Sequence, residues 1–151
     1  MFQVSMKTQY AIRALVHLAK TDSDCAARIA ETEHIPVKYL EGILNQLKLS
    51  GFIVSDRGRA GGYHLAKPAQ SVRMKEVVEA TDGDVRPVEC IEDKQVCALG
   101  STCMPRKFWL GLKTAVDDYL ASVTLAELAE EPAAEEPAAD PGGKPAAAKG
   151  E

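Results

Sequence analysis

Apolar residues recur at helical spacing through the first fifty positions of the chain. Their spacing in 7–20 predicts an amphipathic helix, and a short second helix follows over 26–32. Pro36 suits the first position of a third helix, which ends at Leu49 with Gly51 as its C-terminal cap. The apolar stripe of this third helix consists of Leu40, Ile43, Leu44 and Leu47. Three helices of these lengths, the last two joined by a tight turn, are typical of a helix-turn-helix.

The pattern changes after the third helix. Short apolar runs at 52–54 and 63–65 flank a polar, glycine-rich segment at 56–62, which predicts a two-stranded hairpin with a long tip. A hairpin that directly follows a helix-turn-helix is the wing of a winged helix. We therefore expect 1–82 to form a winged helix-turn-helix that includes a further short helix over 74–81.

The longest periodic stretch lies further along the chain, where a helix is predicted from Pro105 to Val123. Its apolar positions are Phe108, Trp109, Leu112, Val116, Tyr119 and Leu120. A small winged helix leaves little apolar surface in its own chain for such a helix to cover, so we interpret it as a dimerisation helix. The alternative is a core helix packed within its own chain. Thr124 and Glu127 form a capping box, so 105–129 is expected to hold this helix and a short capping helix. The expected fold class is mainly α with a small β-hairpin wing.

Composition and charge add a functional direction. The chain has 151 residues, 46% of them hydrophobic, which suits one ordinary core. No apolar run reaches the roughly eighteen residues of a membrane span, so we expect a soluble cytoplasmic protein without a membrane partner. The formal net charge is -4, yet 1–75 carries 11 basic and 6 acidic side chains while 76–128 carries 5 and 10. This asymmetry is typical of a DNA-binding module joined to a module that does not bind DNA.

The last segment, 130–151, is almost wholly Ala, Pro, Glu, Gly and Lys, without aromatic or large aliphatic residues. It cannot bury enough apolar surface to offset the entropy of ordering it. We interpret it as a disordered acidic tail that adds solubility or contacts a partner, and we expect the fold to end near Leu128.

Basic residues of the first half are candidate DNA contacts. The wing tip combines Arg57 and Arg59 with Gly61 and Gly62, whose backbone can approach a partner closely. This combination suits phosphates or a narrow minor groove, although loop arginines can also be ordinary solubilising charges. The lysines most suited to phosphate contacts are Lys7, Lys38, Lys48 and Lys67.

Three of the four cysteines, Cys90, Cys97 and Cys103, are clustered within 83–104. Clustered thiols in a cytosolic protein are typical first of metal ligation and then of a redox switch. Their spacing is longer than the close cysteine pairs of zinc sites, and no fourth cysteine or histidine lies nearby. Iron-sulfur clusters are bound mainly by thiolates and tolerate longer loops. An iron-sulfur cluster, a zinc ion and a thiol switch are therefore the alternatives for this loop.

Several motifs together resemble one family. They are TQYA at 8–11, IPVKYLE at 35–41, LKLSGFI at 47–53 and RGRAGGY at 57–63. With the three-cysteine loop and the aromatic helix, residues 5–128 resemble the IscR/NsrR/CymR superfamily of bacterial winged-helix regulators. The resemblance implies a homodimeric transcriptional regulator, usually a repressor, on a palindromic site. In sensing members a 2Fe-2S or 4Fe-4S cluster on three cysteines controls DNA binding and reports nitric oxide, redox state or iron-sulfur status.

The resemblance also implies roles for single residues. Cys90, Cys97 and Cys103 match the cluster ligands. Lys38, Tyr39 and Glu41 fall where the recognition helix meets base edges, and Arg57 matches a wing arginine that enters the minor groove. Glu41 would accept a hydrogen bond from cytosine, although most exposed carboxylates are simply solvated.

Two departures from the family concern a fourth cluster ligand. The iron-sulfur-assembly branch has a histidine three residues after the last cysteine, where this sequence has Arg106. The nitric-oxide-sensing branch has an aspartate before the first-helix tyrosine, where this sequence has Gln9, and an amide oxygen is a poor iron ligand. The open alternatives are Gln9, Glu89, Glu92, Asp93, a water and a small thiol. A cluster with three protein ligands is expected to be labile, which suits a sensor.

The sequence lacks common catalytic motifs. It has no phosphate loop, no G-x-S-x-G elbow and no paired acid and base near a glycine-rich strand end, so we expect it not to be an enzyme. Two other functions are open: a thiol or metal redox protein without specific DNA binding, and a cluster-free, zinc or thiol-switch regulator of the same fold. The former would not bind duplex DNA with steep salt dependence. A cluster-free regulator would bind DNA identically after replacement of the three loop cysteines.

Overall fold

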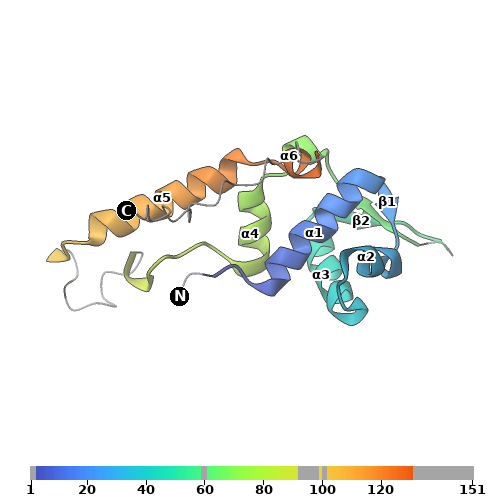
Figure 1. Ribbon diagram of the computed structural model, residues 1–151, viewed down its shortest axis with the longest axis horizontal. Helices are drawn as coiled ribbons and strands as arrows, with labels where there is room; N and C mark the ends of the chain where they lie inside the picture. Colours follow the sequence, from blue (N-terminus) through green and yellow to red (C-terminus); the bar gives the residue numbers. More distant parts are fainter. Residues whose placement is uncertain (1–2, 59–60, 92–98, 100–101, 131–151) are drawn as a thin grey trace, which may run out of the picture.

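The computed structural model describes residues 3–58, 61–91, 99 and 102–130. Its elements in chain order are α1 (Met6–Thr21), β1 (Ser23–Asp24), α2 (Ala26–Glu33), α3 (Val37–Leu49), β2 (Ile53–Ser55), β3 (Tyr63–Leu65), η1 (Ala69–Ser71), α4 (Met74–Asp82), η2 (Glu89–Ile91), α5 (Arg106–Ser122) and α6 (Leu125–Ala129). Helices α1 to α3 and the small sheet gather at one end, α5 extends away from them as an arm, and α4 stands between (Figure 1). The expected class, mainly α with a small β wing, is confirmed.

The hydrophobic core of the winged helix lies where α1, α2 and α3 meet. Its members include Leu15, Leu18, Ile29, Leu40, Ile43, Leu44 and Leu47. Full burial of one such side chain stabilises the fold by about 1.5–3 kcal/mol, so the stripe predicted for the third helix is the side that holds α3 in place. His34, with a left-handed φ of 51°, ends α2 and starts the short turn to α3. Pro36 precedes α3 instead of beginning it, because its ψ of 126° is extended rather than helical.

The predicted hairpin is present, because β2 and β3 pair antiparallel across the 56–62 tip, and a third strand, β1, which the sequence did not predict, joins it. The strand order is β1-β3-β2, and both pairs are antiparallel. β1 pairs Ser23 with His64 and Asp24 with Tyr63. A strand of two residues is too short to show an alternating pattern of polar and apolar residues. β1 is recognised as a strand only because it pairs with the edge of β3. Gly62 is buried beside β1, where a Cβ atom would lie 3.0 Å from the carbonyl oxygen of Asp24.

The C-terminal helices differ in how they pack. None of the residues of α5 is buried, whereas each of the helices α1 to α4 buries two or more. The predicted capping box begins α6: the Thr124 N–H donates to Glu127 Oε2 at 2.9 Å, and the Glu127 N–H donates to Thr124 Oγ1 at 3.3 Å. Leu125 then enters the core with no exposed surface, and its N–H donates to the Val72 carbonyl at 2.9 Å. The chain therefore returns to the winged helix after the α5 arm.

The described helices include none that is both long enough and apolar enough to cross a membrane. α5, with 17 residues, carries polar and charged side chains among its apolar ones.

Candidate nucleic-acid interface and metal centre

The candidate DNA contacts on α3 lie on its solvent side. Lys38, Glu41 and Lys48 are exposed. Tyr39 is 43% exposed. Its ring packs edge-to-face with the ring of Tyr10, at a centroid distance of 5.8 Å. α3 thus buries its apolar stripe and presents basic, acidic and aromatic side chains to solvent. These are the residue types that read base edges and phosphates.

The wing tip lies between β2 and β3. Arg57 is exposed, and Arg59 lies outside the described residues. The Asp56 N–H donates to the Gly62 carbonyl at 2.8 Å and so closes the tip at its base. Gly61 is exposed, whereas Gly62 is buried against β1, so the sheet itself requires a glycine at 62. The described part of the tip therefore presents the Arg57 guanidinium beside an open glycine backbone.

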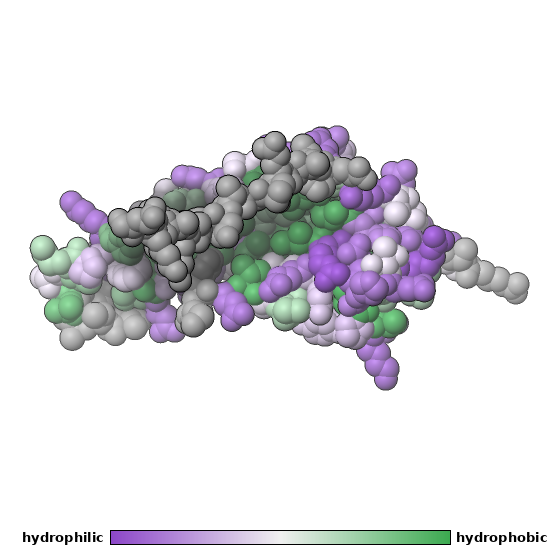
Figure 2. Space-filling view, viewed as in Figure 1, coloured by the Kyte–Doolittle hydropathy of each residue, from purple (hydrophilic) through white to green (hydrophobic). Residues whose placement is uncertain are grey.

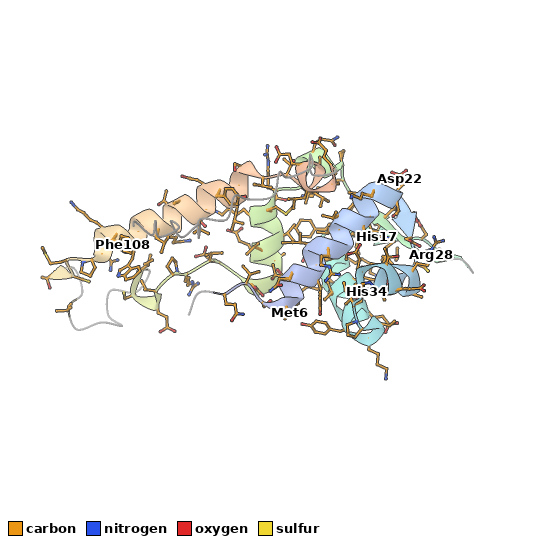
Figure 3. All side chains as sticks on the ribbon, viewed as in Figure 1. Met6, His17, Asp22, Arg28, His34 and Phe108 are labelled. Atoms are coloured by element: carbon orange, nitrogen blue, oxygen red, sulfur yellow. The ribbon has the colours of Figure 1, made fainter. Side chains whose placement is uncertain are left out.

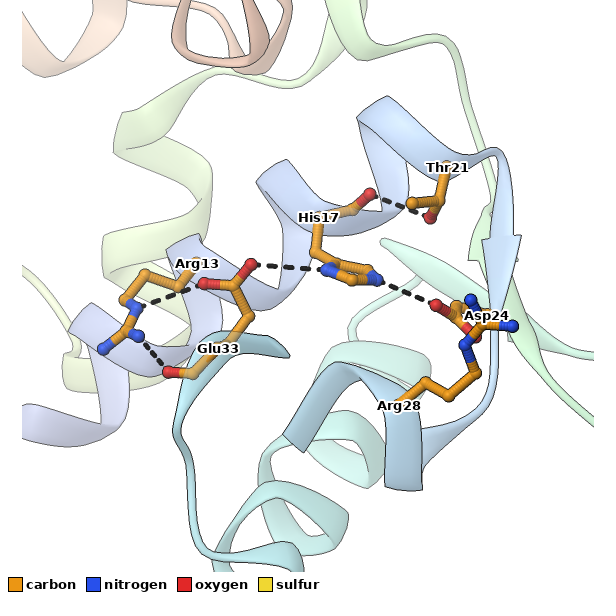
Figure 4. A network of polar contacts seen from close by, with 6 residues as sticks. All are labelled: Arg13, His17, Thr21, Asp24, Arg28 and Glu33. Carbon is orange, nitrogen blue, oxygen red and sulfur yellow. Dashed lines mark hydrogen bonds and ion pairs between the residues drawn. The ribbon is translucent and has the colours of Figure 1, made fainter. Parts of the chain in front are cut away.

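A polar network within the winged helix joins α1, β1 and α2 (Figure 4). His17 of α1 is only 6% exposed, and its ring nitrogens face Asp24 Oδ2 at 3.0 Å and Glu33 Oε1 at 3.3 Å. Arg13 pairs with Glu33 at 3.3 Å, and Arg28 pairs with Asp24 at 3.5 Å. A neutral imidazole carries one N–H and can donate to only one of the two carboxylates, whereas a protonated ring donates to both.

One sign of this network is visible in the sequence. His17 lies within the apolar stripe of α1, next to Leu18, and a polar side chain at such a position needs a buried partner. Its partners come from two other segments, Asp24 and Glu33, and neither follows from helical spacing. The structural role of His17 was therefore not predicted from the sequence.

The carboxyl of Asp24 makes the fold sensitive to acid. Burial raises its pKa, but the hydrogen bonds from His17 and the Cys25 N–H, together with the charge of Arg28, outweigh burial and lower the pKa below its usual value. An unfolded aspartate titrates near about 3.9, so the stabilisation is fully present above that pH and is lost as the pH falls through the folded value. We expect the urea concentration at the midpoint of unfolding to decrease when the pH is lowered below about 4. Asp24→Asn should make this decrease smaller. An unchanged pH dependence in Asp24→Asn would remove this carboxyl from the acid response.

Side chains also connect the recognition helix to the arm. Gln46 of α3 donates from Nε2 to the Ala80 carbonyl of α4 at 2.6 Å. Lys113 of α5 contacts Asp84, just after α4, at 2.7 Å and Asp117 at 3.0 Å. The hydrogen bond to Asp84 is the largest reason that the pKa of Lys113 is raised, so this ion pair persists at neutral pH. α4 therefore contacts α3 through Gln46 and the arm through Lys75, whose Nζ lies 3.7 Å from Asp117 Oδ2 of α5.

Two of the clustered cysteines belong to the described residues. Cys90 lies in η2 and Cys103 lies just before α5; both are half-buried free thiols, and Cys97 falls outside the described residues. Arg106, the first residue of α5, contacts both segments. It donates from Nη1 to the Cys90 carbonyl at 2.9 Å, and from its backbone N–H to the Cys103 carbonyl at 3.3 Å. Within the described ranges, no three His, Cys, Asp or Glu side chains are grouped to hold a metal ion.

The cysteine segments and the DNA-facing residues lie at opposite ends of the molecule. Phe108, in the first turn of α5, is far from Arg28 and His34 of the helix-turn-helix (Figure 3). Any effect of the cysteine loop on DNA binding must therefore pass along α5 or through a partner chain.

The apolar positions predicted for dimerisation lie along this arm. Phe108, Leu112 and Tyr119 are 63%, 39% and 69% exposed, and Trp109, Val116 and Leu120 are half-buried. An apolar cavity of about 360 Å³ lies between α4 and α5, lined in part by Val78, Val116 and Tyr119. Apolar surface shows over this middle part of the molecule, whereas hydrophilic residues dominate over the winged helix (Figure 2). The arm therefore carries an apolar surface without a partner among the described residues.

Comparisons with known proteins agree with this arrangement. Residues 4–131 match the Rrf2 family model, described as an iron-dependent transcriptional regulator. The chain is 30% identical over 132 residues to an HTH-type transcriptional regulator of Neisseria meningitidis serogroup A, covering 85% of this chain and 88% of that protein. It is 32% identical over 129 residues to the HTH-type transcriptional regulator IscR of Yersinia pseudotuberculosis, covering 83% and 78%.

A solved structure extends the likeness to the fold. CymR, the global cysteine regulator of Bacillus subtilis, matches with a TM-score of 0.72 and 29% identity, over 85% of this chain and 97% of that one. These relatives are transcriptional regulators and not enzymes, as the sequence predicts. The family match, the DNA-facing winged helix and the similar solved fold lead to one conclusion: the chain belongs to the Rrf2 family of helix-turn-helix transcriptional regulators.

Proposed function

We propose that the chain is a homodimeric repressor of a palindromic operator, and that an iron-sulfur cluster on Cys90, Cys97 and Cys103 controls its DNA binding. The observation that carries this proposal is the convergence of the Cys90 and Cys103 segments on Arg106. Segments 13 residues apart in the chain are thereby held together at the start of the arm. The description of the Rrf2 family as iron-dependent supports the same assignment.

The donor set fits a cluster of this kind. Thiolates are the main protein ligands of iron-sulfur clusters, and neither Cys90 nor Cys103 is consumed in a disulfide. A bound 2Fe-2S or 4Fe-4S cluster would supply a group that nitric oxide, oxidation or iron shortage alters. Gln9 donates its side-chain N–H to the Val4 carbonyl at 3.0 Å, and its amide oxygen is a poor iron ligand. A carboxylate, a water or a small thiol would then complete the ligand set.

The dimer rests on α5. Its exposed apolar side chains and the adjoining cavity against α4 offer a surface that a second copy of the same helix can cover. A two-fold dimer would place two α3 helices at a fixed separation, as two half-sites one helical turn apart require. Because α4 contacts α3 through Gln46 and α5 through the ion pair of Lys75 with Asp117, a shift at the cysteine loop would change that separation.

A charge on the arm tests the dimer. Leu112→Asp places a carboxylate in the proposed contact, where burial without a partner is costly, so we expect a monomer in sedimentation experiments at micromolar concentration. Thr114→Asp adds the same charge on the other side of the helix and should leave the dimer intact. A dimeric Leu112→Asp variant would show that α5 is not the interface.

Removing the wing arginine tests the DNA interface. Arg57→Ala should weaken binding to a mapped operator by about 1–3 kcal/mol, which is about fivefold to more than a hundredfold in Kd. Arg57→Lys keeps the charge but loses the planar guanidinium, and we expect it to recover only part of the affinity. The measurement is a fluorescence anisotropy titration at fixed salt, with a scrambled duplex as reference. If all three proteins bind the operator equally, the wing does not take part.

The cluster itself is tested by anaerobic purification, followed by a visible absorption spectrum and iron and sulfide analysis. A coloured protein with matched iron and sulfide supports the proposal. A colourless protein that binds the operator identifies a cluster-free, zinc or thiol-switch regulator. A colourless protein that binds DNA without sequence preference would favour the redox-protein alternative.

A further inference from the structure

We propose that Arg106 is a positioning residue that holds the Cys90 and Cys103 segments in place for the cluster. This inference rests on the proposed cluster site and deepens it. Arg106 is half-buried, and its two Nη atoms donate to consecutive carbonyls, Cys90 at 2.9 Å and Ile91 at 2.8 Å. Its own N–H donates to the Cys103 carbonyl at 3.3 Å. A single residue thus fixes the backbone of one cysteine relative to another.

The chemistry of arginine excludes a direct role as a ligand. A guanidinium carries five N–H donors, no acceptor, and stays protonated at any pH a protein survives, so it offers no lone pair to iron. Its planar fork instead suits two parallel acceptors, here the carbonyls at 90 and 91. Arg106 therefore shapes the site and leaves the fourth iron position to a different group.

The position of Arg106 makes this clamp effective. It is the first residue of α5, and the next turns of that helix carry the apolar side chains of the proposed dimer contact. η2 packs against α5 through the same contacts. Cluster uptake then requires less ordering of the chain, because two of the three thiolates already belong to segments that are tied together.

Two origins of such an effect can be separated. The clamp acts through directed hydrogen bonds to two carbonyls, whereas a positive charge alone would attract thiolates from any nearby position. Arg106→Lys keeps the charge and loses the fork, and Arg106→Ala loses both. Lys107→Ala removes the neighbouring exposed cation, which forms no hydrogen bond or ion pair with the described residues. It is the matched control for charge.

The experiment measures two properties of each variant. The first is the rate at which the anaerobically purified protein loses its visible absorption to an excess of iron chelator. The second is the affinity of the metal-free protein for Cd²⁺, followed by thiolate-to-metal absorption, which needs no assembled cluster. Removal of an outer-shell partner typically costs about 10–100-fold in metal affinity, and we expect a change of that size in both measurements for Arg106→Ala. Arg106→Lys should resemble Arg106→Ala, and Lys107→Ala should resemble the parent.

Each outcome decides one question. If the parent holds no cluster, the proposed function fails, and the Cd²⁺ affinities still decide whether Arg106 positions the thiols. If the parent holds a cluster and Arg106→Ala matches Lys107→Ala in both measurements, the clamp is refuted while the cluster stands. Full recovery by Arg106→Lys would overturn the clamp in favour of charge alone. Thermal unfolding of the metal-free variants confirms that the winged helix is intact.

Discussion

Cys103→Ser is expected to abolish cluster binding and to fix operator affinity at the value of the metal-free parent. A serine hydroxyl stays protonated at neutral pH and is a poor iron ligand, so the loop would keep only two of its thiolates. Coupling between two sites of a protein typically changes affinity by about 5–150-fold. The operator affinity of Cys103→Ser should therefore differ from that of the cluster-bound parent by a factor in this range. The measurements are iron and sulfide content and an operator titration, each made anaerobically.

Cys25→Ser is the control for Cys103→Ser. Cys25 precedes α2 within the winged helix and is also a half-buried free thiol, but it belongs to the end of the molecule that binds DNA. The control should keep its cluster and the parent's response to cluster loss. A Cys103→Ser protein with normal iron and sulfide would remove this residue from the ligand set.

The second large effect concerns stability. Leu125→Ala should lower the free energy of unfolding by about 2–5 kcal/mol, because it leaves a cavity where a fully buried side chain fills the core. A loss of this size corresponds to a fall in Tm on the order of 10 °C. Thermal unfolding of the metal-free protein measures it. The same result would show that α6 is part of the winged-helix core.

Leu128→Ala is the matched control, because it shortens the same side chain on the same helix at a position that is 41% exposed. Surface substitutions usually change stability by about 0.5 kcal/mol or less. Equal losses in the two variants would contradict a specific role of the buried Leu125 side chain in the core.

The sequence predicted those structural features that depend on residues close together in the chain. The α3 stripe and the Thr124–Glu127 capping box follow from spacings of three and four residues, and the structure contains both. β1 could not be predicted, because its partner, His64, lies 41 positions after Ser23 in the chain. The same holds for His17, whose two carboxylates come from separate segments.

The candidate site divides in the same way. Residue types and motif likeness predict the three cysteine ligands and the DNA contacts, and these assignments stay predictions, whereas the family match confirms the class of protein. The contact from Arg106 to the Cys90 carbonyl crosses 16 positions and joins two irregular segments. No periodicity encodes such a contact, and the sequence marked Arg106 only as the residue that replaces a histidine of related proteins.

The return of the chain to its core through Leu125 also affects the order of events during synthesis. A ribosome delivers α1 to α4 first, but the space that Leu125 fills stays empty until the whole of α5 has been made. Every chain whose winged helix has finished folding therefore already carries the arm through which we propose it dimerises. A chain terminated before α6 lacks part of its core and is expected to be more exposed to proteolysis than the complete chain.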